Sequence, residues 1–202
     1  MDVYEALYTT RAMRRVKNDP IPLEVQRKIL DAAVRAPSGG NQQPWRFVLL
    51  ESPEVRSIIA EGARRTWEAM TELYGAERPP DDAVDPRSRV FRAMYEHMAG
   101  AATVPVCIVC CVQPQRGATD LEQGGSIFPA IQNFLLAARA YGLGAAITLW
   151  HRQVDDELRS VTGIPNDWMV AATITAGWPR GGHGPVRRKP AADVICVDRW
   201  ND

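Results

Sequence analysis

An uncharged but strongly polar segment, Pro37–Pro44, contains residue types that suit ligand binding. It reads Pro-Ser-Gly-Gly-Asn-Gln-Gln-Pro and so combines two glycines, one hydroxyl and three amides. Glycine lets the backbone approach a ligand closely, and amide side chains both donate and accept hydrogen bonds. A heterocycle with ring carbonyls and ring nitrogens, such as a flavin, presents matching groups. The alternative interpretation is a simple turn, because Ser, Gly and Asn are common turn residues.

Arginine-rich clusters near both ends of the chain are the candidate sites for an anion. Arg11, Arg14 and Arg15 form the first cluster, and Arg187–Lys189 form the second. The planar guanidinium binds phosphate oxygens in pairs and stays charged, so either cluster could hold a phosphate group. For the first cluster, the alternative is a solvated basic face at the C-terminal end of a helix, where cations are favoured.

The net charge argues against one class of partner. The chain has 24 basic and 24 acidic residues and a formal net charge of zero, whereas nucleic-acid-binding domains are usually basic. This disfavours a DNA-binding helix-turn-helix that includes Pro22–Val34. The N-terminus lacks the pattern of a signal peptide, and no apolar segment reaches the roughly 18 residues of a membrane span. We therefore predict a cytoplasmic protein with no nucleic-acid or membrane partner.

No motif for nucleophilic catalysis or metal binding is present. Cys107 and Cys110 have the spacing of a redox or zinc pair, but a second pair is missing and their neighbours are apolar. Core packing is therefore predicted for them, as for any cysteine in a buried strand. No histidine pairs with Ser or Cys in a known motif, and no spacing fits a metal. The histidines, predicted to be surface or capping residues, are His97, His151 and His183.

Hydrophobic periodicity predicts the elements that would position these residues. Helices are predicted over residues 2–9, 23–35, 53–74, 87–100, 127–141 and 154–161. Strands are predicted over 46–51, 104–112, 145–150 and 169–178, with a further candidate over 194–200. Residues 113–125 are a predicted loop, and the proline-rich segment 75–86 is a loop with the length of a lid over a site.

The helix over 127–141 has predicted caps at both ends. Ser126 is the predicted N-cap, and Gly142 suits a left-handed C-terminal position. The strand over 104–112 shows no apolar–polar alternation, so both of its faces should be buried. Helices and strands that alternate along 202 residues predict a single domain over 1–202, of the α/β or α+β class, around one sheet.

Four segments of the sequence together resemble the FMN-dependent nitroreductase family. Ala36–Trp45 is similar to the family motif in which a helix ends at Pro-Ser and Asn-x-Gln-Pro-Trp leads into the first central strand. Gly142–Gly144 resembles the turn before the strand that passes the flavin ring. Arg11–Arg15, and Gly177–Pro179 followed by Arg187–Pro190, resemble the segments whose basic residues hold FMN. The resemblance implies an α+β sandwich, with a mainly antiparallel sheet flanked by helices, in an intertwined homodimer.

The resemblance also implies which residues contact the cofactor. The implied contacts are Arg11, Ala12, Met13 and Arg15, then Pro37, Ser38, Gly39, Asn41 and Gln43, then Thr148 and Leu149, and finally Arg187 and Arg188. Met13 stands where the family has a serine, so that hydroxyl contact is lost and the arginines must hold more of the phosphate and ribityl chain. The family builds each site from two subunits, with the loop 37–41 from one and Arg11, Arg15 and Arg188 from the other. The tail 181–202 would contact the partner.

The implied activity is a ping-pong transfer through FMN. NADH or NADPH would deliver hydride to flavin N5, and a nitroaromatic, a quinone or a similar electron-poor compound would accept it. The cofactor then carries the chemistry, which explains why no catalytic side chains are recognisable. Arg15 is the candidate for stabilising the negative charge of the reduced ring. The alternatives are reductive dehalogenation or flavin fragmentation on the same fold, or flavin binding without turnover.

Overall fold

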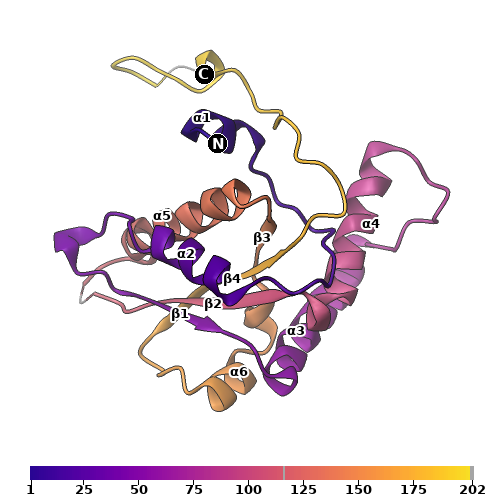
Figure 1. The fold of residues 1–202 in the computed structure, drawn as a ribbon, viewed down its shortest axis with the longest axis horizontal. Helices are drawn as coiled ribbons and strands as arrows, with labels where there is room; N and C mark the ends of the chain where they lie inside the picture. Colours follow the sequence, from indigo (N-terminus) through magenta and orange to yellow (C-terminus); the bar gives the residue numbers. More distant parts are fainter. Residues whose placement is uncertain (116, 201–202) are drawn as a thin grey trace.

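A four-stranded antiparallel sheet forms the centre of the molecule (Figure 1). The computed structural model describes residues 1–115 and 117–200. The strands are β1 (Trp45–Leu49), β2 (Val106–Val112), β3 (Gly144–Thr148) and β4 (Met169–Gly177). Their order in the sheet is β1-β2-β4-β3, and every neighbouring pair is antiparallel. The predicted α+β class and antiparallel sheet are confirmed, and β3 lies at one edge.

Helices cover both faces of this sheet (Figure 1). They are α1 (Val3–Thr9), α2 (Leu23–Ala33), α3 (Pro53–Tyr74), α4 (Pro86–Ala99), α5 (Asp120–Ala140) and α6 (Asp155–Thr162). Residues of α2 and α5, including Ile29 and Ile131, share one apolar cluster with the sheet. Residues of α3 and α6, including Ile59 and Leu158, share the other. Within residues 1–115 and 117–200, no helix has the length and apolarity needed to cross a bilayer.

Strand β2 is buried on both faces, as its uninterrupted apolar sequence predicts. Cys107 and Cys111 pack into the cluster of α3 and α6, while Cys110 packs into the cluster of α2 and α5. Burial raises the pKa of the Cys107 thiol to about 12, so this thiol stays protonated and unreactive at neutral pH. The prediction that these cysteines pack in the core is confirmed.

The segment Arg11–Lys17 lies along the free edge of β3 and the end of β4. The backbone N–H of Met13 donates to the carbonyl oxygen of Ala145 over 2.9 Å, and the N–H of Lys17 donates to that of Trp178 over 2.7 Å. The contact is close because Gly144 has no side chain. A Cβ atom at Gly144 would lie 2.7 Å from the Met13 Cβ. The first arginine cluster is therefore fixed to the sheet.

Helix α5 begins at Asp120, so the prediction of a loop over 113–125 is wrong in its second half. Thr119 is the N-cap, and it forms a capping box in which Glu122 bonds back to the Thr119 backbone. This reciprocal cap stabilises a helical start that Gly124 and Gly125 would otherwise disfavour. Ser126 lies buried inside the helix and is not its cap.

The position of the cap can be tested with two matched serine or threonine substitutions. Thr119→Ala is expected to lower the free energy of unfolding by about 1 kcal/mol, because an orphan backbone N–H loses its acceptor. Ser126→Ala is expected to change it by less than about 0.5 kcal/mol, since Ala is the better residue inside a helix. Urea unfolding of both variants measures the difference. A larger loss of stability for Ser126→Ala than for Thr119→Ala would mean that the helix begins after Ser126, as the hydrophobic periodicity predicts.

Two further strand predictions are corrected. Strand β3 ends at Thr148, and Trp150 lies in a short 3-10 helix, Trp150–Gln153. The final strand over 194–200 is not formed, and the side chains of Ile195 and Val197 are 63% and 74% exposed. A β-branched run favours a strand only where a neighbouring strand completes its hydrogen bonds. Within the described part of this chain, no strand pairs with the tail.

The predicted loop over 75–86 is confirmed up to its last residue, where α4 begins. Arg92 of α4 fixes this loop, because its Nη2 donates to the carbonyl oxygen of Ala83 over 2.9 Å and also to that of Pro80. The loop therefore projects together with α4 beyond the sheet (Figure 1).

Candidate functional site

A cavity of about 650 Å³ lies at the edge of the sheet, between β3, α1, α5 and the C-terminal tail. We call it the β3 cavity. Its lining includes Arg11 and Ala12 from the first cluster, Ala145 and Ile147 from β3, and Arg188 from the tail. Its volume is typical of small-molecule and cofactor sites. The fold thus brings Arg11 and Ala12, from the start of the predicted site, together with Arg188 from its end.

The β3 cavity has a positively charged rim. The side chain of Arg11 is held by the tail, since its Nη2 donates to the carbonyl oxygen of Gly182 over 3.1 Å. Arg188 donates from Nη1 to the carbonyl oxygen of Arg187 over 2.8 Å. No Asp or Glu is among the described residues that line the cavity. Two guanidinium groups without a carboxylate make this rim suited to a phosphate. Arg187 does not line the cavity.

The exposed edge of β3 supplies backbone groups to the same cavity. Ala145 turns its carbonyl group outward, where it accepts from Met13. Alternate residues of an antiparallel strand face the same edge, so Ile147 also presents its backbone N–H and C=O outward. Because the direction of the backbone groups alternates along a strand, Ile147 could have been predicted from the sequence as a residue of the site. It was not among the predicted residues.

Thr148 and Leu149, the two residues predicted beside the flavin, differ in their exposure to solvent. Thr148 is buried, and its hydroxyl forms a hydrogen bond with the hydroxyl of Thr173 on β4. Its side chain is therefore engaged inside the sheet. Leu149 lies just beyond the end of β3 and is 44% exposed. Of this pair, Leu149 is the residue that is open to a ligand.

The segment 11–15 has a second hollow, of about 440 Å³, on the side facing α4. We call it the arginine hollow. Arg11, Ala12, Met13 and Arg15 line it, and Arg11 and Ala12 also line the β3 cavity, so the two spaces adjoin. Arg14 lies here too, although its place in the sequence suggested a merely solvated residue. The side chain of Arg15 is 60% exposed and pairs with Glu96 of α4 over 3.0 Å.

The predicted ring-binding loop has a constrained backbone. Asn41 and Gln43 have φ angles of 55° and 50°, a region that residues other than glycine rarely adopt. The Ser38 hydroxyl accepts from the backbone N–H of Gln43 over 2.9 Å, which holds the turn closed. Trp45, only 5% exposed, anchors the loop at the start of β1. Residues in this region cluster at active sites and ligand clamps, which makes the loop a candidate for ligand binding.

This loop does not reach the β3 cavity within the same chain. Pro37, Ser38, Gly39, Asn41 and Gln43 line neither the β3 cavity nor the arginine hollow. Gly39 instead borders a hollow of about 160 Å³ beside the N-terminal part of α5. Figure 1 shows the loop between α2 and β1 at the end of α5 that lies away from β3. The two halves of the predicted site are therefore separated in a single chain.

The prediction that all three histidines are surface or capping residues is wrong for two of them. His97 and His151 are 7% and 3% exposed. His97 Nε2 lies 2.7 Å from the Thr175 hydroxyl, and its ring packs on Trp150 at 4.7 Å between centroids. Burial lowers the pKa of each imidazole to about 4. Both are therefore neutral at pH 7 and belong to the packing beneath the sheet.

These depressed pKa values predict how stability depends on pH. Between about 6.5, the ordinary value, and about 4, the unfolded chain binds a proton that folded His97 does not. Lowering the pH through this window therefore destabilises the fold, by up to about 1.4 kcal/mol per pH unit for one histidine. His97→Gln, which can still bond to Thr175, is expected to reduce this dependence by about one proton. Urea unfolding from pH 7 to pH 4 measures it, and an unchanged dependence would contradict the assignment.

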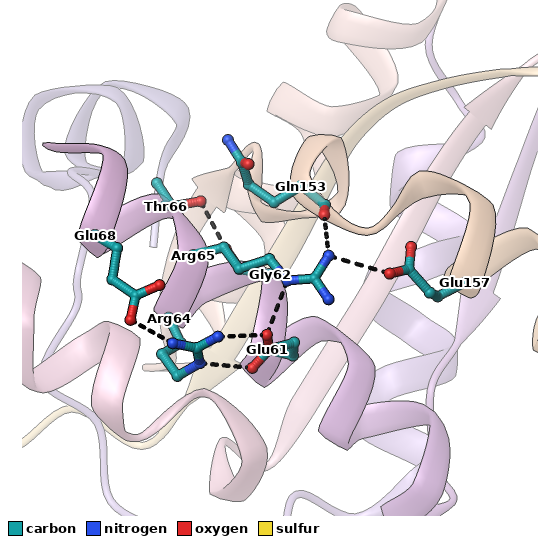
Figure 2. Close-up of polar contacts among 8 residues, drawn as sticks. All are labelled: Glu61, Gly62, Arg64, Arg65, Thr66, Glu68, Gln153 and Glu157. Carbon is teal, nitrogen blue, oxygen red and sulfur yellow. Dashed lines mark hydrogen bonds and ion pairs between the residues drawn. The ribbon is translucent and has the colours of Figure 1, made fainter. Parts of the chain in front are cut away.

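The basic pair Arg64–Arg65 forms a neutralised network and not an open anion site (Figure 2). Glu61 pairs with both arginines, over 2.6 Å and 2.8 Å. Arg64 also pairs with Glu68, and Arg65 pairs with Glu157 of α6 over 3.1 Å. These carboxylates balance the two guanidinium charges. Among the residues the structure describes, no cluster of His, Cys, Asp and Glu has the makeup of a metal site.

Comparisons with known proteins identify the family and the fold. Residues 7–178 match the family model described as Nitroreductase family. A Thermus thermophilus protein named NADH dehydrogenase is 28% identical over 204 residues, covering 96% of this chain and 95% of that protein. A Rhodospirillum rubrum protein named 5,6-dimethylbenzimidazole synthase is 30% identical over 191 residues, covering 90% and 84%. The solved structure of the FMN and NADPH-dependent nitroreductase NfnB from Sphigopyxis sp. strain HMH shares the fold, with a TM-score of 0.71, 18% identity and coverage of 99% and 100%.

Proposed function

Since this chain belongs to the nitroreductase family, we propose that it is an FMN-dependent oxidoreductase. Its electron donor is NADH or NADPH, and its acceptor is an electron-poor compound such as a nitroaromatic or a quinone. The observation that carries the proposal is the β3 cavity, where Arg11 and Arg188 meet the exposed edge of β3. The names of the relatives, an NADH dehydrogenase and an FMN and NADPH-dependent nitroreductase, support it.

The residues of the β3 cavity fit FMN by their chemistry. Arg11 and Arg188 would hold the phosphate, because two guanidinium groups can share its oxygens. The outward backbone of Ile147 and the exposed Leu149 would lie beside the ring, whose edge carries both donors and acceptors. When bound, FMN supplies the hydride chemistry that no side chain of this protein supplies. Arg15 lines the adjoining arginine hollow and not the β3 cavity, and it is the candidate for placing a positive charge where the reduced ring becomes negative.

We further propose that the partner subunit of a homodimer completes each site. In one chain the loop 37–43 lines neither the β3 cavity nor the arginine hollow, so in the proposed dimer the second copy would bring Ser38, Asn41 and Gln43 to the ring. Apolar residues of α1 and of the tail support this assembly. Tyr4 and Tyr8 are 68% and 65% exposed, and Trp200 is 88% exposed. Exposed apolar surfaces mark protein interfaces or ligand-binding grooves, and Tyr4 and Tyr8 also line the β3 cavity.

The function is tested on the full chain, reconstituted with FMN. We expect a yellow dimer whose flavin absorbance is bleached by NADH or NADPH without oxygen and is restored by a nitroaromatic or a quinone. Initial rates at several acceptor concentrations should give the parallel double-reciprocal lines of a ping-pong mechanism. A protein that stays colourless after incubation with FMN would contradict the proposal. Flavin binding without bleaching by NADH or NADPH would mean that the chain binds flavin but has no oxidoreductase activity.

A second candidate is flavin fragmentation, which the similarity to the 5,6-dimethylbenzimidazole synthase favours. The two activities separate when oxygen is admitted to the reduced protein with no other acceptor. An oxidoreductase should recover its complete oxidised flavin spectrum. Fragmentation would consume the flavin and release a benzimidazole, which mass spectrometry detects.

A further inference from the structure

The arginine hollow gathers positive charge from three separate parts of the fold. The segment 11–15 along β3 contributes three arginines, and α4 and the segment after β4 contribute one each. They are Arg11, Arg14, Arg15, Arg89 and Arg180. The other lining residues are small or apolar, among them Val90 and Ala93 of α4. The hollow is therefore a basic recess of about 440 Å³ beside the β3 cavity.

These charges are almost uncompensated. Glu96 pairs with Arg15, and among the described residues no other carboxylate forms an ion pair with an arginine of the hollow. Arg64 and Arg65 differ, because Figure 2 shows Arg64 paired with Glu61 and Glu68, and Arg65 paired with Glu61 and Glu157. Uncompensated arginines that face one recess repel each other, and an anion relieves that repulsion.

Part of the hollow is ordered before any ligand arrives. Arg180 donates from Nε to the carbonyl oxygen of Val16 over 2.9 Å. Its backbone N–H donates to the carbonyl oxygen of Arg15 over 3.0 Å. Among the described residues, none accepts a hydrogen bond from the Arg180 Nη groups. Arg11 is fixed by the carbonyl oxygen of Gly182. Arginines already held by the backbone lose little further freedom on binding, which favours a tight and specific contact.

We propose that the arginine hollow binds the 2′-phosphate of NADPH and so makes NADPH the preferred electron donor. This inference rests on the proposed function. A phosphate monoester is a dianion with three terminal oxygens, so it can take more than one guanidinium fork, and NADH lacks this group. The hollow adjoins the β3 cavity through Arg11 and Ala12. The FMN phosphate is assigned to Arg188 and Arg11, which leaves Arg14, Arg89 and Arg180 for a second anion.

The test compares the two donors on the FMN-loaded enzyme. Arg89→Gln is expected to lower kcat/KM for NADPH about 10- to 100-fold, mainly through KM, because one charged hydrogen-bond partner is lost. The values for NADH and the Kd for FMN should stay unchanged. Arg87→Gln is the matched control, since Arg87 lies on the same helix but packs over the Phe91 ring outside the hollow.

A direct titration separates this inference from the proposed function. Adenosine 2′,5′-bisphosphate should bind the unmodified protein more tightly than 5′-AMP does, with or without FMN, and Arg89→Gln should reduce the difference about 10- to 100-fold. Equal use of NADH and NADPH, or equal binding of the two nucleotides, overturns the inference while leaving the oxidoreductase intact. Weaker FMN binding in Arg89→Gln would also overturn it, because the hollow would then hold the cofactor phosphate.

Discussion

Arg188→Ala is expected to weaken the binding of FMN about 10- to 100-fold. Arg188 lines the rim of the β3 cavity together with Arg11, and no described lining residue is acidic. A hydrogen bond to a charged group contributes about 1.5–3 kcal/mol, and about 1.4 kcal/mol corresponds to a factor of ten in Kd. Quenching of FMN fluorescence on titration with apoprotein gives the Kd. Because Arg188 is exposed, the melting temperature of the apoprotein should not change.

Two comparisons make this result specific to the phosphate. Riboflavin has the same ring but no phosphate, so Arg188→Ala and the unmodified protein should bind it equally. Arg187→Ala is the matched control, because Arg187 does not line the cavity and should affect FMN binding less. Equal losses in the two arginine variants would mean that the tail attracts FMN only through its general charge.

Where the sequence carries local signals, it predicts the fold closely. Helix α3 spans the predicted residues, 53–74, because both of its ends have strong local determinants. Ser52 caps the first turn, Pro53 occupies the first helical position, and Gly75 ends the helix with a φ of 60°. Each of these signals acts within a few residues of chain. The start of α5 had a comparable signal in Thr119 and Glu122, but the adjacent glycines favoured a loop.

Features that depend on distant parts of the chain were not predictable from local patterns. The run over 194–200 has strand-forming residues, but a strand also needs a partner that the sequence does not specify. Arg89 and Arg180 belong to no motif, and only the packing of α4 beside the segment 11–15 brings them together. By contrast, Arg11 and Arg188 were identified through family resemblance, and the structure places both at one cavity.

The role of Gly144 also could not be predicted from the local sequence. The turn after α5 needs one glycine, Gly142, which has a φ of 78°, so local geometry leaves Gly144 unexplained. Its role appears only when the segment 11–15 is in place. The Met13 side chain occupies the space that a Cβ of residue 144 would require. Gly177 is similar, because a Cβ there would lie 2.8 Å from the Val16 Cβ.

Gly144→Val is therefore expected to destabilise the fold and to weaken FMN binding together. The added Cβ would lie 2.7 Å from the Met13 Cβ, so the segment must move off the edge of β3. Overpacking of this kind costs about 1–3 kcal/mol, which for a chain of this size lowers the melting temperature by about 2–12 °C. Arg11 moves with the segment, so the Kd for FMN should rise at least about tenfold.

The combined change in melting temperature and FMN affinity distinguishes a displaced segment 11–15 from the loss of a single phosphate ligand. Arg188→Ala removes a phosphate ligand and leaves the melting temperature unchanged, whereas Gly144→Val should change both the stability and the affinity for FMN. Gly184→Val is the control, because a Cβ at Gly184 meets no atom within 4 Å, and it should shift the melting temperature by less than about 2 °C. If Gly144→Val kept both its melting temperature and its FMN affinity, the segment 11–15 could not depend on the close contact with β3. The binding arginines would then have to be positioned by the tail alone.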